Sequence, residues 1–385
     1  MREAADGRQF GADLPDPLLW SGTSHLLESD SHRRALSCLD EFLNSHAERA
    51  IADSTKRAIF QHDLWAVFDW AAEPNDYLPQ RHELQIRLAT AIRRLALTPD
   101  EARALPDNYA VAVASHRFAR AYDQRNPQRP FLPPDLFLPD SSWICLSAYS
   151  GEPAGSLMHF TGRSRFLVFM RLPAGREATL SYIRRLRSSS QPPRIPNSRG
   201  AEVLNLAVPQ FPAGTEVALI RQALLIDAQG TLVPASLTET IELRVYRTLT
   251  PGTPYENFLQ DPASHDQDFF EFRMFRPELF AGQSGGLVAV HPDEAEYATF
   301  ATHGDDPLES TESYARFLQP EPILERCRGC HTAEGIHSVQ SRHQWMNPGP
   351  SAQTQGREEN QSAIAAKLSR PDFKLLQQFW RPSPD

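Results

Sequence analysis

Long apolar runs and runs of one charge are both missing from this chain of 385 residues. No stretch approaches the run of about 18 to 20 apolar residues that crosses a bilayer, so we expect no membrane span. Its 39 basic and 48 acidic residues are mixed along the sequence and leave a formal net charge of −9. Because no basic stripe is present to neutralise a phosphate backbone, we expect no nucleic-acid binding.

Cysteine is also scarce, with four residues in the whole chain. Cys38 falls in a predicted helix and Cys145 in an apolar, strand-like segment. We therefore expect these two residues to be separate buried thiols rather than a disulfide. The other two cysteines stand close together near the C-terminus.

The length and the 41% of apolar residues are typical of a globular protein with more than one domain. We predict a helical domain over residues 20–125. Apolar residues recur at spacings of three and four over 36–43, 60–71 and 84–95, which indicates three amphipathic helices. The sequence Thr98-Pro99-Asp100-Glu101 has the pattern of a capping box and predicts a fourth, short helix.

A β-rich domain is predicted over residues 140–305, after a proline-rich break at 126–134. Apolar and polar residues alternate over 241–247 and 270–274, and 166–172 is an apolar run, as in strands. Turn residues at 227–230 lie between the apolar segments 223–226 and 232–233, which predicts a hairpin. Helical spacing over 177–186 predicts one short helix in this domain.

Helical periodicity returns in the last predicted domain, residues 306–385. A final helix is expected over 363–380, with Pro371 marking a kink or a break. The fold class predicted from these patterns is α+β and multidomain. It has an N-terminal helical domain, a central β-rich domain and a small α-helical C-terminal segment.

The strongest chemical signal is Cys327-Arg328-Gly329-Cys330-His331, the C-x-x-C-H pattern of covalent haem attachment. Two thiols three positions apart can add to the vinyl groups of one porphyrin edge, and the adjacent imidazole can then ligate the iron. With 4 Cys and 13 His in the chain, about 0.001 accidental matches are expected from composition alone. The motif therefore predicts one covalently bound haem c.

Two other chemistries use similar residues. A zinc site would combine Cys327 and Cys330 with His337 and His343, which are suitable ligand types with a short central spacer. A thioredoxin-like dithiol would open a helix within a βαβ unit, whereas this motif follows a predicted helix. The haem interpretation is preferred, and the zinc site stays as an alternative.

In this region the chain resembles the class I cytochrome c family. The resemblance covers residues 306–385 and depends on Cys327, Cys330, His331, Met346 and the terminal helix around Phe379 and Trp380. It implies that the cysteines hold the haem, that His331 is the proximal ligand and that Met346 is the distal ligand. The gap between His331 and Met346 is shorter than in typical members, so His343, His337 or an open sixth position are alternatives.

We expect one-electron transfer through this haem, with a redox protein as partner and no prediction for the oligomeric state. The alternative enzyme is a haem-dependent peroxidase or oxidoreductase with an open distal site. The alternative binding protein is a zinc-stabilised interaction module. The expected location is periplasmic or otherwise extracytoplasmic, of bacterial type, because the thiols meet haem there. Residues 1–8 are too charged for a signal peptide, so we expect the sequence to start downstream of the true N-terminus.

One further motif, Gly282-Gln283-Ser284-Gly285-Gly286, matches the G-x-S-x-G pattern of serine hydrolases. A nucleophile elbow needs a helix after the turn, but residues 287–290 are typical of a strand. We therefore interpret the motif as a glycine-rich turn and predict no catalytic residue in the chain.

Overall fold

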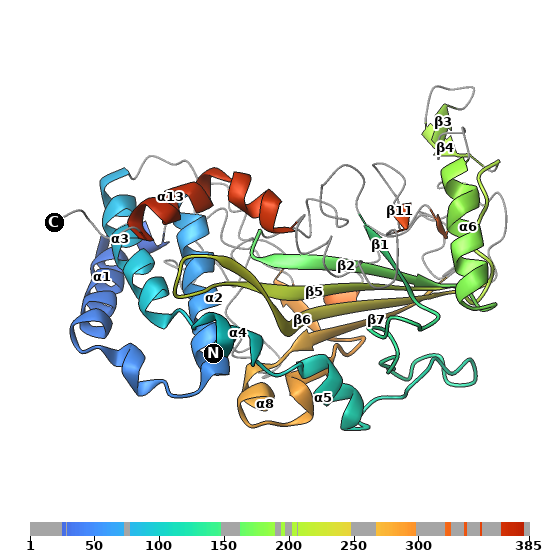
Figure 1. Cartoon of the computed structure of the whole chain (residues 1–385), viewed down its shortest axis with the longest axis horizontal. Helices are drawn as coiled ribbons and strands as arrows, with labels where there is room; N and C mark the ends of the chain where they lie inside the picture. Colours follow the sequence, from blue (N-terminus) through green and yellow to red (C-terminus); the bar gives the residue numbers. More distant parts are fainter. Residues whose placement is uncertain are drawn as a thin grey trace.

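The computed structural model describes residues 25–27, 29–72, 78–147, 162–188, 194–196, 202–205, 207–247, 267–297, 320–324, 335–336, 347–348 and 363–380. Within them, helices surround a seven-stranded antiparallel sheet (Figure 1). This confirms the predicted α+β class. None of the helices in these ranges is long and apolar enough to span a membrane.

The strands of the main sheet follow the order β11-β1-β2-β5-β6-β7-β8, and each neighbouring pair is antiparallel. Their bounds are β1 Ile144–Ser147, β2 Ser164–Arg171, β5 Glu216–Ile226, β6 Leu232–Tyr246, β7 Gln267–Met274, β8 Leu287–Ala289 and β11 Asn347–Pro348. Two small sheets pair β3 (Arg194–Pro196) with β4 (Glu202–Leu204) and β9 (Ala295–Tyr297) with β10 (Pro320–Pro322). The predicted strands and the predicted hairpin are therefore confirmed.

Most of the predicted helices are also present. They are α1 Ser29–Asn44, α2 Ser54–Ala71, α3 Leu78–Leu95, α4 Pro99–Arg103, α6 Arg176–Ser188 and α13 Pro371–Trp380. The helix expected before Cys327 lies mostly outside the described residues, and of its described part 320–322 form β10 and 323–324 are helical. The Thr98 side chain and Glu101 form the expected capping box at α4. Residues 363–369 are helical and α13 begins at Pro371, which confirms a break there. Sequence patterns did not predict the short helices α5 (Asn108–Ala114) and α8 (Arg276–Phe280).

The β5–β6 hairpin extends beyond the sheet into the helical end of the molecule (Figure 1). Leu224, Ile226 and Leu232 from its tip share a core with side chains of α2, α3 and α13. Buried Gln61 on α2 also bonds to the hairpin, because its amide nitrogen donates to the Ile226 carbonyl (2.7 Å) and its oxygen accepts from the Ile226 amide (3.2 Å). Helices and hairpin therefore have one continuous core.

A bulge interrupts the pairing of β5 and β6, with register shifts between Arg221 and Leu224. Asn108 from α5 satisfies the backbone there: its Oδ1 accepts from the Thr238 amide (2.7 Å) and its Nδ2 donates to the Thr238 carbonyl (3.0 Å). A buried backbone group without such a partner is costly. Asn108 therefore fastens α5 to the bulge.

The two faces of the sheet have different covers. On one face, Tyr109 and Ala112 of α5 and side chains from residues 131–143 pack on alternate residues of β2, β5, β6 and β7. On the other face, Tyr182, Ile183 and Leu186 of α6 pack on β1, β2 and β5, together with Val208, Phe211 and Ile336. In Figure 1, α6 lies at the end of the sheet opposite α1, α2, α3 and α13.

The C-terminal helix α13 packs on α2 and α3 at the helical end (Figure 1). Trp380 also lies over the hairpin turn, where a Cβ atom on Gly230 would be 2.8 Å from its ring. Gly230 has φ +81°, so it also needs the conformational freedom of glycine. The division at 20–125, 140–305 and 306–385 stays a prediction, but α13 and the N-terminal helices share a core.

The two cysteines outside the motif differ in burial. Cys145 is buried as expected, but the expectation for Cys38 is wrong, because this side chain is exposed on α1. In the last helical segment, residues 363–380, the apolar residue Leu368 is 42% exposed. Its neighbour Lys367 has no exposed surface at all. The cause is a set of carboxylates on the inner side of this segment, described below.

Candidate functional site

The residues predicted to bind haem are not among the described residues. This holds for Cys327, Cys330, His331 and Met346, and for the alternatives His337 and His343. Their roles stay predictions. Within the ranges described above, no cluster of three or more His, Cys, Asp or Glu residues is arranged to hold a metal ion.

The described residues nearest to the motif in sequence are buried on the sheet. Before it, Ile323 and Leu324 are 3% and 4% exposed and pack with Phe269 and Val290. After it, Ile336 is 1% exposed, packs in the α6 cluster, and its amide donates to Gln210 Oε1 (2.8 Å). The described residues before and after the motif, Leu324 and Ile336, are therefore both anchored by packing against the sheet.

Strand register shows that both anchors use the same sheet face. Phe269 on β7 is the cross-strand partner of Arg244, which in turn pairs with Val217 and then Met170. Directly paired residues point to the same face of an antiparallel sheet. Leu324 contacts the Phe269 end of this row and Ile336 belongs to the cluster that contains Val217 and Met170.

The same face carries buried charges. Glu242 pairs with Glu271 across β6 and β7, and the two residues are 8% and 4% exposed. Arg244, two residues along β6, is 4% exposed, and Arg273 Nε lies 2.6 Å from Glu271 Oε1. The alternating pattern at 241–247 predicted two faces of different polarity. It did not predict that the charged face is buried.

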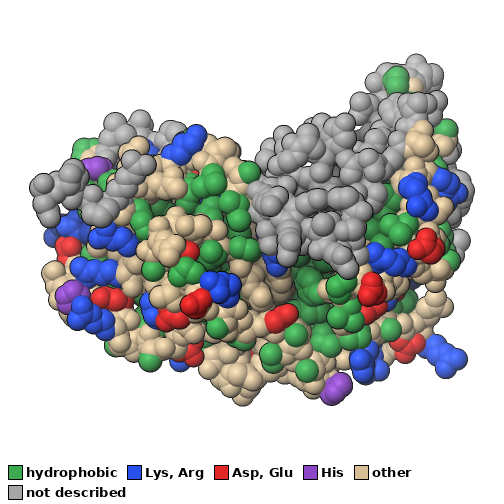
Figure 2. All heavy atoms as spheres, in the orientation of Figure 1, with side chains coloured by type: hydrophobic (Ala, Val, Ile, Leu, Met, Phe, Trp, Pro, Cys, Tyr) green, Lys and Arg blue, Asp and Glu red, His purple; other side chains and the backbone are tan. Residues whose placement is uncertain are grey.

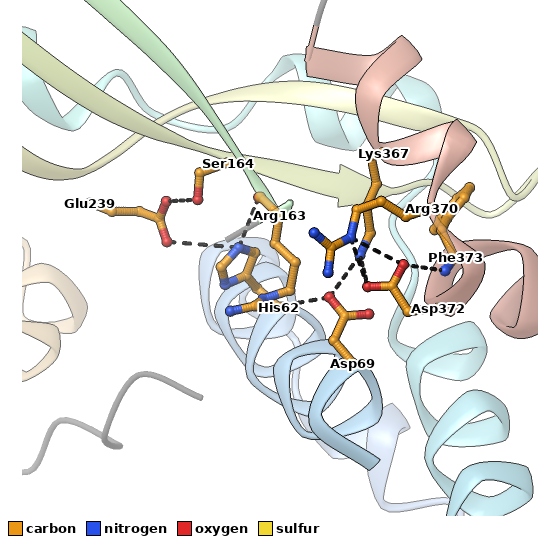
Figure 3. A network of polar contacts seen from close by, with 9 residues as sticks. All are labelled: His62, Asp69, Arg163, Ser164, Glu239, Lys367, Arg370, Asp372 and Phe373. Atoms are coloured by element: carbon orange, nitrogen blue, oxygen red, sulfur yellow. Dashed lines mark hydrogen bonds and ion pairs between the residues drawn. The ribbon is translucent and has the colours of Figure 1, made fainter. Parts of the chain in front are cut away.

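A second buried polar cluster, the Lys367 network, joins residues 363–380 to α2 and to Arg163, which directly precedes β2 (Figure 3). Lys367 Nζ lies 2.7 Å from Asp69 Oδ2 and 3.0 Å from Asp372 Oδ2. Arg163 Nη1 is 3.1 Å from the same Asp69 oxygen, and Arg370 Nε is 3.0 Å from Asp372 Oδ2. Each carboxylate thus has two cationic partners.

Aromatic rings complete the surroundings of Lys367. Its Nζ lies 5.0 Å from the ring centroid of Trp65 and 6.0 Å from that of Phe373. A cation at these distances is attracted by the ring quadrupole. Burial alone would raise the pKa of Asp372, but Lys367 and Arg370 hold it below its ordinary value. The network therefore keeps Asp372 ionised inside the protein.

The side chains of His62, Glu239 and Ser164 meet beside the Lys367 network (Figure 3). His62 Nε2 lies 3.1 Å from the Arg163 carbonyl oxygen and 3.7 Å from Glu239 Oε1, and the Ser164 hydroxyl donates to Glu239 Oε2. In a nucleophilic triad the hydroxyl bonds to the imidazole. Here the carboxylate stands between them, so the arrangement fits a structural link and not a nucleophile.

The Gly282–Gly286 motif is a packing turn. The strand β8 follows it directly, as the sequence predicts. Gly282, Gly285 and Gly286 all have positive φ, and a Cβ atom on Gly285 would be 2.0 Å from the Asn108 carbonyl oxygen. Glycine here lets the turn approach α5, which explains the motif without catalysis.

Comparison of this chain with protein-family models, with curated proteins and with solved structures gives no match. The surface charge does not indicate a type of partner either, because acidic and basic side chains are interspersed over the coloured surface in Figure 2. The functional argument therefore depends on the residues themselves. The donor set of the motif, two thiolates and an imidazole, suits thioether attachment and iron ligation.

Proposed function

We propose that this chain carries one haem, attached covalently through Cys327 and Cys330, and transfers single electrons. The observation that carries the proposal is the sequence Cys327-Arg328-Gly329-Cys330-His331. His331 would be the proximal ligand. Met346 is the preferred distal ligand, with His343, His337 or an open position as alternatives.

When bound, a haem c supplies reversible one-electron chemistry at its iron. The protein's part is to hold the group and to set its surroundings. Buried anchors on both sides of the motif, at Leu324 and Ile336, support this role because sites on rigid elements keep their geometry. The partner would be a redox protein, and the location periplasmic or otherwise extracytoplasmic.

The domain organisation that we propose with this function is an N-terminal helical domain, a β-rich domain and a cytochrome c-like segment over residues 306–385. The sheet supports it by offering one continuous surface under both anchors of the motif. The pairing of β11 with β1 supports it further, because Asn347 directly follows Met346 in the sequence.

Haem attachment is tested by expression in a host with haem-attachment machinery, followed by denaturation and haem staining. We expect the wild type to keep haem through acid-acetone extraction and to show the mass increase of one haem. The double variant Cys327→Ser/Cys330→Ser should lose all covalent haem. Cys38→Ser is the matched control, since this exposed thiol lies outside the motif and its loss should leave attachment unchanged.

Several results would contradict the proposal. A wild-type protein that keeps no haem but binds zinc, and loses zinc in His337→Ala or His343→Ala, is a zinc-stabilised protein. If haem is retained, Met346→Ala should change the ligand-sensitive absorption bands of the reduced protein. Unchanged bands in Met346→Ala with altered bands in His343→Ala would assign the sixth ligand to histidine.

A further inference from the structure

Lys367 and Asp69 are held in contact inside the protein, away from solvent (Figure 3). The Lys367 side chain has no exposed surface, the Asp69 side chain is 7% exposed, and Lys367 Nζ lies 2.7 Å from Asp69 Oδ2. One carboxyl C–O bond adds about 1.2 Å, so Nζ is within about 3.9 Å of the Asp69 carboxyl carbon. Reacting atoms in a near-attack arrangement are about 3–3.5 Å apart. The lysine nitrogen and this carbon are therefore close to bonding geometry.

The two oxygens of Asp69 have different surroundings. Oδ2 is 3.1 Å from Arg163 Nη1 and also contacts Lys367. Oδ1 is buried and has no hydrogen-bond partner among the residues that the structure describes. A buried acceptor without a partner is costly, more so when it carries charge. Loss of Oδ1 would remove that cost, and Arg163 is placed to hold the oxygen that stays.

A second carboxylate contacts the same lysine nitrogen. Asp372 Oδ2 lies 3.0 Å from Lys367 Nζ and 3.0 Å from Arg370 Nε. Burial raises the pKa of Asp372, but Lys367 and Arg370 together hold it below its ordinary value. An ionised carboxylate within hydrogen-bond distance of a proton is placed to remove it as a general base.

Aromatic rings close this site to water. Trp65 and Phe373 are 0% and 1% exposed, and their ring centroids lie 5.0 and 6.0 Å from Lys367 Nζ. An amine and a carboxylic acid release water when they form an amide, and hydrolysis of the amide consumes water. A site that excludes water therefore protects the amide once the released molecule has left.

We propose that Lys367 and Asp69 join in an intramolecular amide bond, with Asp372 carrying the protons. Nζ bonds to the Asp69 carboxyl carbon, and the bond from this carbon to Oδ1 breaks. Two protons pass in turn from the nitrogen to Oδ1 by way of Asp372, and Oδ1 leaves as water. One positive and one negative charge disappear together, so the net charge does not change. No oxidant, reductant or cofactor takes part, so this inference is independent of the haem.

The amide ties the last helical segment to α2. Asp69 and Lys367 are 298 residues apart in the sequence, so their side chains meet only in the folded protein. The ion pair is the starting state, and the stability of unreacted chains depends on it. After the reaction, residues 363–380 cannot separate from α2 without the breaking of a covalent bond.

Mass spectrometry of the full chain tests the bond without any variant. After incubation we expect the wild-type mass to be lower, by one water molecule, than that of the sequence with any bound haem added. Trypsin should then fail to cut after Lys367, and digestion should yield a branched peptide that joins this residue to Asp69. A chain that never loses the water, or a branched peptide that involves another carboxyl group, overturns the inference.

Variants test the role of each group. Lys367→Met should keep the full mass. Asp372→Asn should form the amide about 100-fold more slowly, because it lacks the general base, and Asp372→Glu should recover part of the rate. Lys374→Met is the matched control, since Lys374 is an exposed lysine on α13, and the rate should not change. Formation in Asp372→Asn at the wild-type rate overturns the role of Asp372.

Discussion

Replacement of Lys367 by methionine removes the central charge of the Lys367 network and keeps a side chain of similar length. Asp69 and Asp372 then remain buried, each with one remaining cationic partner, Arg163 at 3.1 Å and Arg370 at 3.0 Å. Breaking a buried ion pair from one side costs about 3–5 kcal/mol. Because each carboxylate keeps one partner, we expect a loss of about 3 kcal/mol in the free energy of unfolding.

Urea denaturation followed by circular dichroism measures this free energy. Lys374→Met is the matched control, because Lys374 is an exposed lysine on α13, and we expect a change within about 0.5 kcal/mol. Hydrogen exchange adds a local measurement, in which amides of 363–380 should lose protection first. A loss below about 1 kcal/mol for Lys367→Met would refute the reasoning, since that is the range of an exposed ion pair.

Two further predictions concern acid stability and the glycine turn. Because the folded pKa of Asp372 lies below its ordinary value of 3.8, its ionic contribution is present above that value and is lost as pH falls through the folded pKa. Asp372→Asn should therefore be less stable at neutral pH and should lose less stability on acidification, measured by thermal unfolding from pH 7 downwards. Gly285→Ala should lower the free energy of unfolding by about 3 kcal/mol or more, because the alanine would need a positive φ and would clash with Asn108. Gly282→Ala, with a similar φ and open space around it, should lower it by about 1 kcal/mol. Urea denaturation measures both changes. Equal losses in the two glycine variants would show that the close approach to α5 is unimportant.

Local patterns predicted most of the elements because their physical causes are local. Helical spacing identified α1, α2 and α3, and the capping box at Thr98 identified the start of α4. Short helices were missed because five to seven residues contain too few turns for a periodicity to appear, as in α5 and α8. Asn108 looks like an ordinary helix residue until the bulge in β6 is known.

The candidate sites also differ in whether their causes are local in the sequence. The haem motif can be predicted from spacing alone, because its chemistry belongs to five consecutive residues. Lys367 could not be identified, since its partner Asp69 is 298 residues away in the sequence. The alternation over 241–247 places Glu242 on the polar face of a strand. Period-two alternation says which residues share a face, but not whether that face meets solvent.

The sequence by itself therefore determined the longer helices, the main strands and the hairpin, and it predicts the thiol–imidazole chemistry at Cys327, Cys330 and His331. Only the tertiary structure decided which strands are neighbours and which polar groups lose their water. The physical reason is that desolvation and cross-strand pairing depend on segments far apart in the chain. Distant segments give a buried lysine or glutamate its charged neighbours: Lys367 lies beside Asp69 of α2, and Glu242 lies near Arg221 of β5 and Arg273 of β7.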